Sequence, residues 1–157
     1  MHDRLVRIGL AILAITIAPL AVWATFAPRQ FYDDFPGGGR NWVAVDGPYN
    51  EHLVRDVGGL SLALLIVAVF ALVTLSVPLV RATAVAFLVN GVLHVGYHLQ
   101  HLDLYDTADQ VASIGGLLVA PVVALLLLGA TMRSSSSRAS PSSTSGSTTP
   151  TTPMAPS

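Results

Sequence analysis

The sequence predicts an all-α fold: a polytopic membrane protein with an antiparallel bundle of four transmembrane helices and a disordered C-terminal tail. Of its 157 residues, 52% are hydrophobic and only 11% are charged, with a mean hydropathy of +0.63. A soluble domain of this size has too little interior to bury so much apolar surface. The apolar residues also form four long blocks, over residues 8–27, 57–80, 82–98 and 111–130. A helix needs about 20 residues to cross roughly 30 Å of hydrocarbon, so each block suits one crossing.

Composition also restricts the partners and the chemistry. The formal net charge is −1 and no basic patch stands out, so we expect no nucleic acid partner. The chain has no cysteine, which excludes disulfides, thiolate metal sites, iron–sulfur clusters and dithiol redox chemistry. Membrane lipid is the expected partner, and a membrane protein or a second copy of the chain is a further possibility.

We predict one transmembrane domain over residues 1–132. Its helices are expected at about 5–27, 48–78, 82–102 and 109–131, with an outer loop at 28–47. The first block has an alternative interpretation as a cleaved signal peptide, but its apolar run exceeds the usual core of about 7–15 residues. We therefore expect a retained helix that Pro19 kinks without ending it.

The arginines predict the orientation in the membrane. They flank the cytoplasmic ends in the positive-inside arrangement: Arg4, Arg7, Arg81, Arg133 and Arg138. The third loop, residues 99–109, holds three aspartates and no basic residue. This distribution predicts that both termini are cytoplasmic. All basic residues are arginine and none is lysine, which hints at a GC-rich genome and a bacterial plasma membrane.

The C-terminal segment 133–157 is rich in Ser, Thr and Pro. It has almost nothing apolar to bury, and we expect it to be disordered. A solvated terminus accounts for this composition more simply than a modified or partner-binding tail does.

The third apolar block ends in "FLVNGVLHVGYHLQHLD", residues 87–103, which carries three histidines. At 100° per residue, one arc of about 80° collects the polar and aromatic side chains. They are Phe87, Asn90, His94, His98, His101 and Tyr105, and the opposite face has Val85, Val89, Val92, Gly96 and Leu99. A polar stripe inside a membrane turns to the bundle interior or to a water-filled cavity, because lipid offers it no partners.

The second helix brings further polar residues to the same outer level. His52, Asp56, Gly59 and Ala63 share one face of it, and Glu51 and Arg55 form an i,i+4 pair beside them. Gly59 and Ala63 are small enough to let a neighbouring helix approach closely. On the fourth helix, Asp109 starts a similar series.

The turn at 76–81 is short, so the second and third helices should pack side by side. We therefore expect at least one histidine of the third helix within hydrogen-bond or shared-ligand reach of Glu51, His52 or Asp56.

Several functions fit these residues. The candidate cofactor-binding residues are His52, Asn90, His94, His98 and His101, and the candidate metal ligands are His94, His98, His101, Glu51 and Asp56. Neutral imidazoles bind zinc, copper and iron, and one or two of them can ligate haem. A quinone head group needs only hydrogen-bonding partners such as His and Asn, and a proton path would use the His–Asp series. The alternative is a non-catalytic accessory or structural subunit whose polar network satisfies itself or docks a partner. The sequence leaves enzyme status open.

The outer loop is long enough to fold over the mouth of the bundle, which makes it a candidate lid. Its aromatic residues suit the headgroup level of the bilayer. They are Phe31, Tyr32, Phe35, Trp42 and Tyr49. The run Gly37–Gly39 lacks the Lys-Ser/Thr of a phosphate loop, so we interpret it as a flexible turn.

The four-span plan also resembles a known group of proteins. With "GPYNEHLVRD" opening the second helix and "HVGYHLQHLD" ending the third, it is similar to small four-helix membrane proteins of actinobacteria that are broadly DoxX-like. The resemblance covers residues 1–130 and implies a fold more than an activity. The link of the DoxX name to quinone-coupled oxidation favours a redox role. No catalytic residue is carried over.

Overall fold

A computed structural model of the 157-residue chain describes residues 2–136, with five α-helices among them. The helices are α1 (His2–Phe26), α2 (Pro28–Asp34), α3 (Glu51–Thr74), α4 (Val77–Leu99) and α5 (Thr107–Ser136). Two short antiparallel strands, β1 (Pro36–Gly37) and β2 (Arg40–Asn41), and two 3₁₀ turns, η1 (Ala44–Asp46) and η2 (Leu102–Leu104), complete the described part. The predicted disordered tail at 133–157 lies outside the described residues from position 137 onward.

Four of these helices are long and apolar enough to cross a membrane. The candidate spans in the described part are Asp3–Phe26, Glu51–Thr74, Val77–Leu99 and Thr107–Met132. The predicted all-α, multi-pass fold is therefore confirmed. The outer loop holds more structure than expected, because α2, the β-hairpin and η1 all lie within the predicted loop 28–47.

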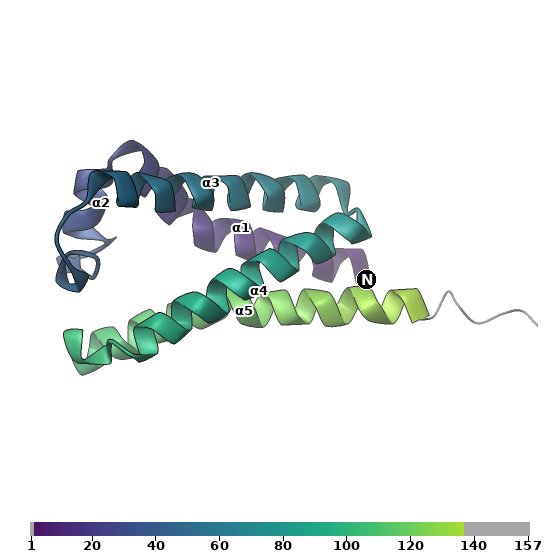
Figure 1. The fold of residues 1–157 in the computed structure, drawn as a ribbon. Coiled ribbons are helices and arrows are strands. Elements are labelled where there is room, and N and C mark those ends of the chain that lie inside the picture. The colour runs from purple at the N-terminus through teal and green to yellow at the C-terminus, as the bar shows by residue number, and fades with distance from the viewer. Residues whose placement is uncertain (1, 137–157) are drawn as a thin grey trace, which may run out of the picture.

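The four long helices associate as two pairs (Figure 1). α1 packs along α3, and α4 packs along α5, while α1 also contacts α5. α3 and α4 follow each other in the chain but contact each other far less than either contacts its main partner. In Figure 1 they meet at their connecting turn, and α4 then runs away from α3 toward the end of the molecule that carries α2. We call the end with the α3–α4 turn the inner end and the opposite end the outer end.

Small residues set this pairing. A Cβ on Gly58 of α3 would lie 2.5 Å from the backbone nitrogen of Thr25 in α1, so only glycine permits this approach. A Cβ on Gly91 of α4 would lie 2.8 Å from Pro121 of α5. The predicted contact residue Gly59 instead has open space around it. The face of α3 that meets another helix is thus displaced by one residue from the predicted one.

The turn between α3 and α4 is tighter than expected. α3 ends at Thr74, Leu75 takes a left-handed conformation with φ 51°, and α4 begins at Val77. A proline in the first turn of α4 favours this early start, because its missing N–H needs no partner there. At the other end, α3 begins at Glu51 and not at 48, because the Asn50 side chain accepts the N–H of Leu53 and caps the helix.

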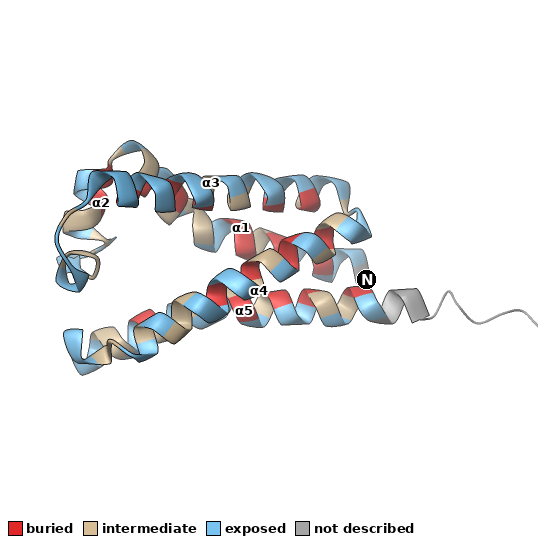
Figure 2. Ribbon diagram, viewed as in Figure 1, coloured by how far each residue is buried: buried red, intermediate tan, exposed pale blue. Residues whose placement is uncertain are grey.

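All four long helices share one apolar core in the inner half. Its fully buried members with large side chains are Leu10, Leu13, Val80 and Phe87, and Ala68, Ala71, Ala84 and Ala124 fill the closest contacts. Figure 2 shows the buried residues on the sides of the helices that face each other and the exposed residues on the outside. A separate cluster at the outer end joins only α1, α2 and α3, through Ala24, Phe31 and Val54.

Two arginines link neighbouring helices in the inner half. Arg7 donates to the carbonyl of Leu72 near the end of α3 (3.0 Å), and Arg81 donates to the carbonyl of Thr131 in α5 (2.7 Å). The C-terminal carbonyls of a helix lack partners within the helix and carry partial negative charge. The Arg7 guanidinium therefore satisfies one of them and stabilises the end of α3, whereas Arg81 links α4 to the body of α5.

Candidate functional site

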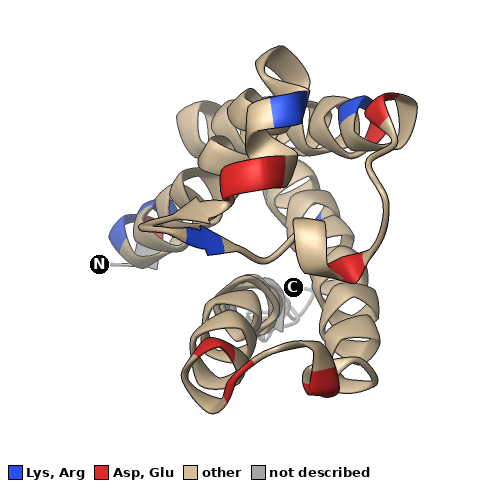
Figure 3. Cartoon of the chain, turned by 90° about the vertical axis from the view of Figure 1, so that its left-hand side faces the viewer, with Lys and Arg blue, Asp and Glu red and all other residues tan. Residues whose placement is uncertain are grey.

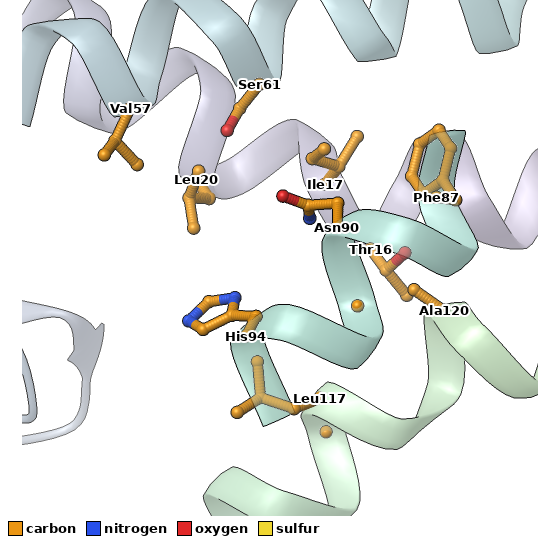
Figure 4. A pocket seen from close by; sticks show the side chains of 12 residues that line it. Thr16, Ile17, Leu20, Val57, Ser61, Phe87, Asn90, His94, Leu117 and Ala120 are labelled. Carbon is orange, nitrogen blue, oxygen red and sulfur yellow. The ribbon is translucent and has the colours of Figure 1, made fainter. Parts of the chain in front are cut away.

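A cavity of about 150 Å³ lies where the two helix pairs separate. All four long helices contribute to its walls (Figure 4). Most of the wall is apolar, as at Ile17, Leu20, Val57, Phe87 and Leu117. The cavity forms because α4 turns away from α3 above the shared core, which leaves the outer half of the bundle without a common apolar filling.

Four polar side chains line this cavity, and the one from α1, Thr16, donates its hydroxyl to the carbonyl of Leu13 in its own helix (3.0 Å). Asn90 and His94 project from the same face of α4, and Ser61 faces them from α3 (Figure 4). Ser61 is buried, with 9% of its surface exposed. An amide, an imidazole and a hydroxyl within mostly apolar walls are typical of a site for a small ligand.

His94 is coupled directly to His98, one helical turn further along α4. Their Nε2 atoms are 3.1 Å apart and share a hydrogen bond, and their ring centroids are 4.9 Å apart. Among the described residues, Nδ1 of His98 has no hydrogen-bond partner although it is buried. The two imidazoles therefore act as one unit, of which His94 is the member that lines the cavity.

The third histidine of α4 is used differently. Nδ1 of His101 donates to the carbonyl of Tyr97 (2.9 Å), and the two rings stack with centroids 4.2 Å apart. The Tyr97 ring also meets His98 edge-on at 5.7 Å. His101 thus caps the end of α4, while the predicted inward arc holds for Phe87, His94 and His98.

The opposite face of α4 is also as predicted. Val85, Val89 and Val92 are all exposed and would face lipid. Asn90 of the predicted inward arc lines the cavity but is exposed, so the sequence assigned the faces of this helix correctly only in part.

The outer loop crosses from the α1–α3 pair to the α4–α5 pair, as a lid would. The Tyr97 hydroxyl donates to Asp46 (3.0 Å), and the Tyr105 hydroxyl donates to the carbonyl of Trp42 (3.0 Å). Arg40 forms an ion pair with Asp109 at 2.6 Å. Burial raises the pKa of the Tyr105 phenol above its ordinary value, so the hydroxyl keeps its donated proton at neutral pH. Figure 3 looks onto this end and shows charged residues around its rim.

The predicted residues of α3 do not join the histidines. His52 is 87% exposed and pairs with Asp56 of its own helix at 3.4 Å. Arg55 binds Glu51 (2.8 Å) and the carbonyl of Thr25 (2.8 Å). Within residues 2–136, no hydrogen bond links Glu51, His52 or Asp56 to a histidine of α4, which contradicts the expectation drawn from the short turn. The helices diverge after the turn, so a common depth in the membrane does not bring these residues together.

The five predicted metal ligands are therefore not assembled into one site. The described part of the chain holds no group of three or more His, Asp or Glu residues arranged to bind a metal ion. Asp109, another residue of the predicted outer polar level, is occupied by Arg40.

Sequence reasoning missed Ser61 and the whole contribution of α1. Thr16, Ile17 and Leu20 line the cavity from a helix that carries no histidine and no acidic residue at this depth. Ser61 lies three residues after Gly58, so the two share the face of α3 that meets α1. The signal available in the sequence was Ser61, which lies about one helical turn after Gly58.

Comparisons with protein-family models, with curated proteins and with solved structures find no match for this chain. The likeness to DoxX-like proteins stays a prediction, and function has to be argued from the site itself.

Proposed function

We propose that this multi-pass membrane protein binds a lipid-soluble ligand with a small polar ring, such as a quinone, in the cavity between its two helix pairs. The observation that carries the proposal is the convergence of Ser61, Asn90 and His94 on one mostly apolar cavity. These groups provide hydrogen bonds for ring oxygens, and the apolar walls provide contacts for the ring itself.

The size of the cavity supports a single ring. An apolar protein cavity of about 150 Å³ holds one benzene molecule. The cavity described above has the same volume. A haem is a much larger plate, so this cavity favours a quinone head group over a haem. The separated acidic groups of α3 likewise make a metal centre a weaker proposal.

A second hollow supports a ligand with an apolar tail. It has a volume of about 360 Å³ and is lined by Leu60, Ala63, Leu64, Val67 and Asn90. Asn90 lines both spaces, so they adjoin at this residue. A ring in the cavity would have its oxygen near the Asn90 amide, and its tail would follow the aliphatic side chains of α3 toward lipid.

Ligand binding can be tested in lipid nanodiscs with a benzoquinone that carries a ten-carbon chain. We expect saturable quenching of tryptophan fluorescence, and the variants Asn90→Leu and Ser61→Ala should weaken binding by about ten-fold each, the value of one hydrogen bond. His52→Gln is the matched control, because His52 lies outside the cavity. Unsaturable quenching, or equal affinity in all variants, would refute the proposal.

A second candidate, a non-catalytic accessory subunit, is favoured by the self-satisfied pairs His52–Asp56 and Glu51–Arg55. Under that function the exposed polar start of α3 docks a membrane protein partner or a second copy. Binding of the quinone with no effect of cavity variants would favour it.

We further propose that both termini are cytoplasmic and that the membrane is a bacterial plasma membrane. The arginine distribution supports this, since Arg7 and Arg81 both lie at the inner end. The chain has no cysteine, so a single introduced cysteine reports its own location. A membrane-impermeant maleimide added to intact cells should label Asn41→Cys and not Ser76→Cys. Labelling of Ser76→Cys but not of Asn41→Cys would indicate the opposite orientation, with both termini outside.

A further inference from the structure

We propose that His98 fixes the tautomer of His94, so that His94 presents an N–H to the cavity and the site selects rings with a carbonyl over rings with a hydroxyl. This inference rests on the proposed function for its ligand. Its first step concerns only the two histidines and stands without any ligand.

The hydrogen bond between the two imidazoles allows two arrangements. Their Nε2 atoms are 3.1 Å apart, so one of them donates and the other accepts. A neutral imidazole carries a single N–H. Whichever ring donates through Nε2 therefore has a bare Nδ1, and the ring that accepts has its proton on Nδ1.

The surroundings of His98 distinguish the two arrangements. In the described structure, Nδ1 of His98 is buried and has no hydrogen-bond partner. If His98 accepted from His94, its own proton would lie on this Nδ1, as a buried N–H without an acceptor. Buried N–H groups without an acceptor are rare in proteins and rarer than under-satisfied acceptors, because they lose their hydration and gain nothing. The favoured arrangement therefore has His98 donating through Nε2 and leaves only a lone pair at Nδ1.

The tautomer of His94 follows from that of His98. Its Nε2 accepts the hydrogen bond, so its proton is on Nδ1. His94 lines the cavity, and in Figure 4 the ring nitrogen nearer to α4 faces the wall formed by α1 and α3. The cavity thus contains one N–H donor whose direction the protein sets in advance.

This fixed donor discriminates between ligands in a way that its neighbours do not. The Ser61 hydroxyl can turn to donate or accept, and the Asn90 amide offers both functions. The N–H of His94 can only donate. A ring carbonyl accepts it with a free lone pair, whereas a ring hydroxyl is a poorer acceptor and adds an O–H that needs an acceptor of its own. We expect the carbonyl ligand to bind about ten-fold more tightly, equivalent to one hydrogen bond.

The tautomers can be measured directly. Protein labelled with ¹⁵N in histidine, in nanodiscs at neutral pH and without ligand, should give a protonated Nδ1 and a bare Nε2 for His94, and the reverse for His98. The single variants His94→Gln and His98→Gln assign the signals, and His52→Gln is the matched control that should leave the pair unchanged. A protonated Nδ1 on His98 would overturn the inference.

The selectivity is tested with a matched pair of ligands: the decyl benzoquinone and its hydroquinone, titrated without oxygen. The quinone should bind about ten-fold more tightly, and His98→Phe should reduce this ratio toward one, because His94 then loses the neighbour that fixes its tautomer. Equal affinity for both ligands in the unaltered protein would overturn the selectivity and leave the proposed function intact. Absence of binding by both ligands would instead overturn the proposed function, and the ¹⁵N pattern would still decide the tautomers.

Discussion

The inner and outer halves of the bundle are built from the same four helices but are held together in different ways. In the inner half, all four helices share one core that contains residues from Val6 to Leu127. In the outer half, the apolar cluster around Phe31 joins only α1, α2 and α3. There the α4–α5 pair is connected to the rest through polar contacts of the outer loop, such as Tyr105 to Trp42 and Arg40 to Asp109.

This difference explains where the cavity lies. In the inner half, the four helices pack closely around the shared core. The cavity begins directly above Phe87, which belongs both to the shared core and to the cavity wall. The polar contacts of the outer half are individually weak, so we expect the two halves to differ in stability.

The largest effect is expected from Phe87→Ala, which removes the side chain at the boundary. Phe87 is 1% exposed, and truncating a buried phenylalanine costs about 3–5 kcal/mol of unfolding free energy. Val89→Ala is the matched control on the same helix, because Val89 is 54% exposed and loses little packing. Reversible unfolding in mixed micelles would measure both. Similar losses in the two variants would mean that the shared core does not stabilise the bundle.

The second-largest loss of unfolding free energy is expected from Gly58→Ala. The added methyl group would meet the backbone of Ala24 and Thr25, which cannot move away as a side chain could. Overpacking of this kind costs about 1–3 kcal/mol. Gly59→Ala adds the same methyl group to open space and should be neutral or slightly stabilising. If both variants behave alike in the unfolding measurement, α1 and α3 do not approach as closely as described.

The sequence was sufficient to predict the helices and the lipid-facing valines of α4, because both depend on local hydrophobic pattern. Val85, Val89 and Val92 lie outside as predicted. It was not sufficient to predict which helices pair. That choice depends on positions of close approach, and on α3 the expectation placed this position at Gly59, whereas the structure uses Gly58. One residue changes the direction on a helix by about 100°, which is enough to select another neighbour.

The candidate site was predicted in part for the same reason. His94, His98 and Asn90 share a face of one helix, so their relation follows from helical geometry alone. The predicted contact of this face with His52 and Asp56 required a particular angle between two helices, which the turn sequence does not determine. Ser61 was missed because its importance depends on which helix pair surrounds it.

The third-largest loss of unfolding free energy is expected from Tyr105→Phe, which removes one hydrogen bond between the outer loop and the side of the molecule with α4 and α5. The Tyr105 side chain is buried and its hydroxyl donates to the carbonyl of Trp42, so its loss should cost about 1 kcal/mol in the unfolding measurement. The raised pKa of the phenol gives a second readout. Since the folded pKa exceeds the unfolded value of about 10, this contribution is complete below pH 10 and is lost as the pH rises through the folded pKa. An unchanged stability in Tyr105→Phe would show that this contact does not hold the outer half.

The smallest effect on global stability is expected from Arg40→Ala, although this variant tests the outer half most directly. The ion pair with Asp109 is partly exposed, with 47% of the Arg40 side chain accessible, and such pairs contribute about 1 kcal/mol or less. Its loss should instead loosen the loop locally, because among the described residues Arg40 provides one of the side-chain links from the loop to the side of the molecule with α4 and α5. Hydrogen–deuterium exchange of residues 36–46 should therefore become faster, while exchange in the inner core stays unchanged. Arg29→Ala is the matched control, since Arg29 pairs with Asp33 inside α2 and its guanidinium otherwise lies over the rings of Tyr32 and Tyr49, none of which belongs to the α4–α5 pair. High salt should reproduce the effect in the unaltered protein, because it screens an exposed pair. If Arg29→Ala and Arg40→Ala change the exchange of the loop equally, or neither does, then the tyrosine contacts alone close the outer end and the ion pair has no role in holding the lid.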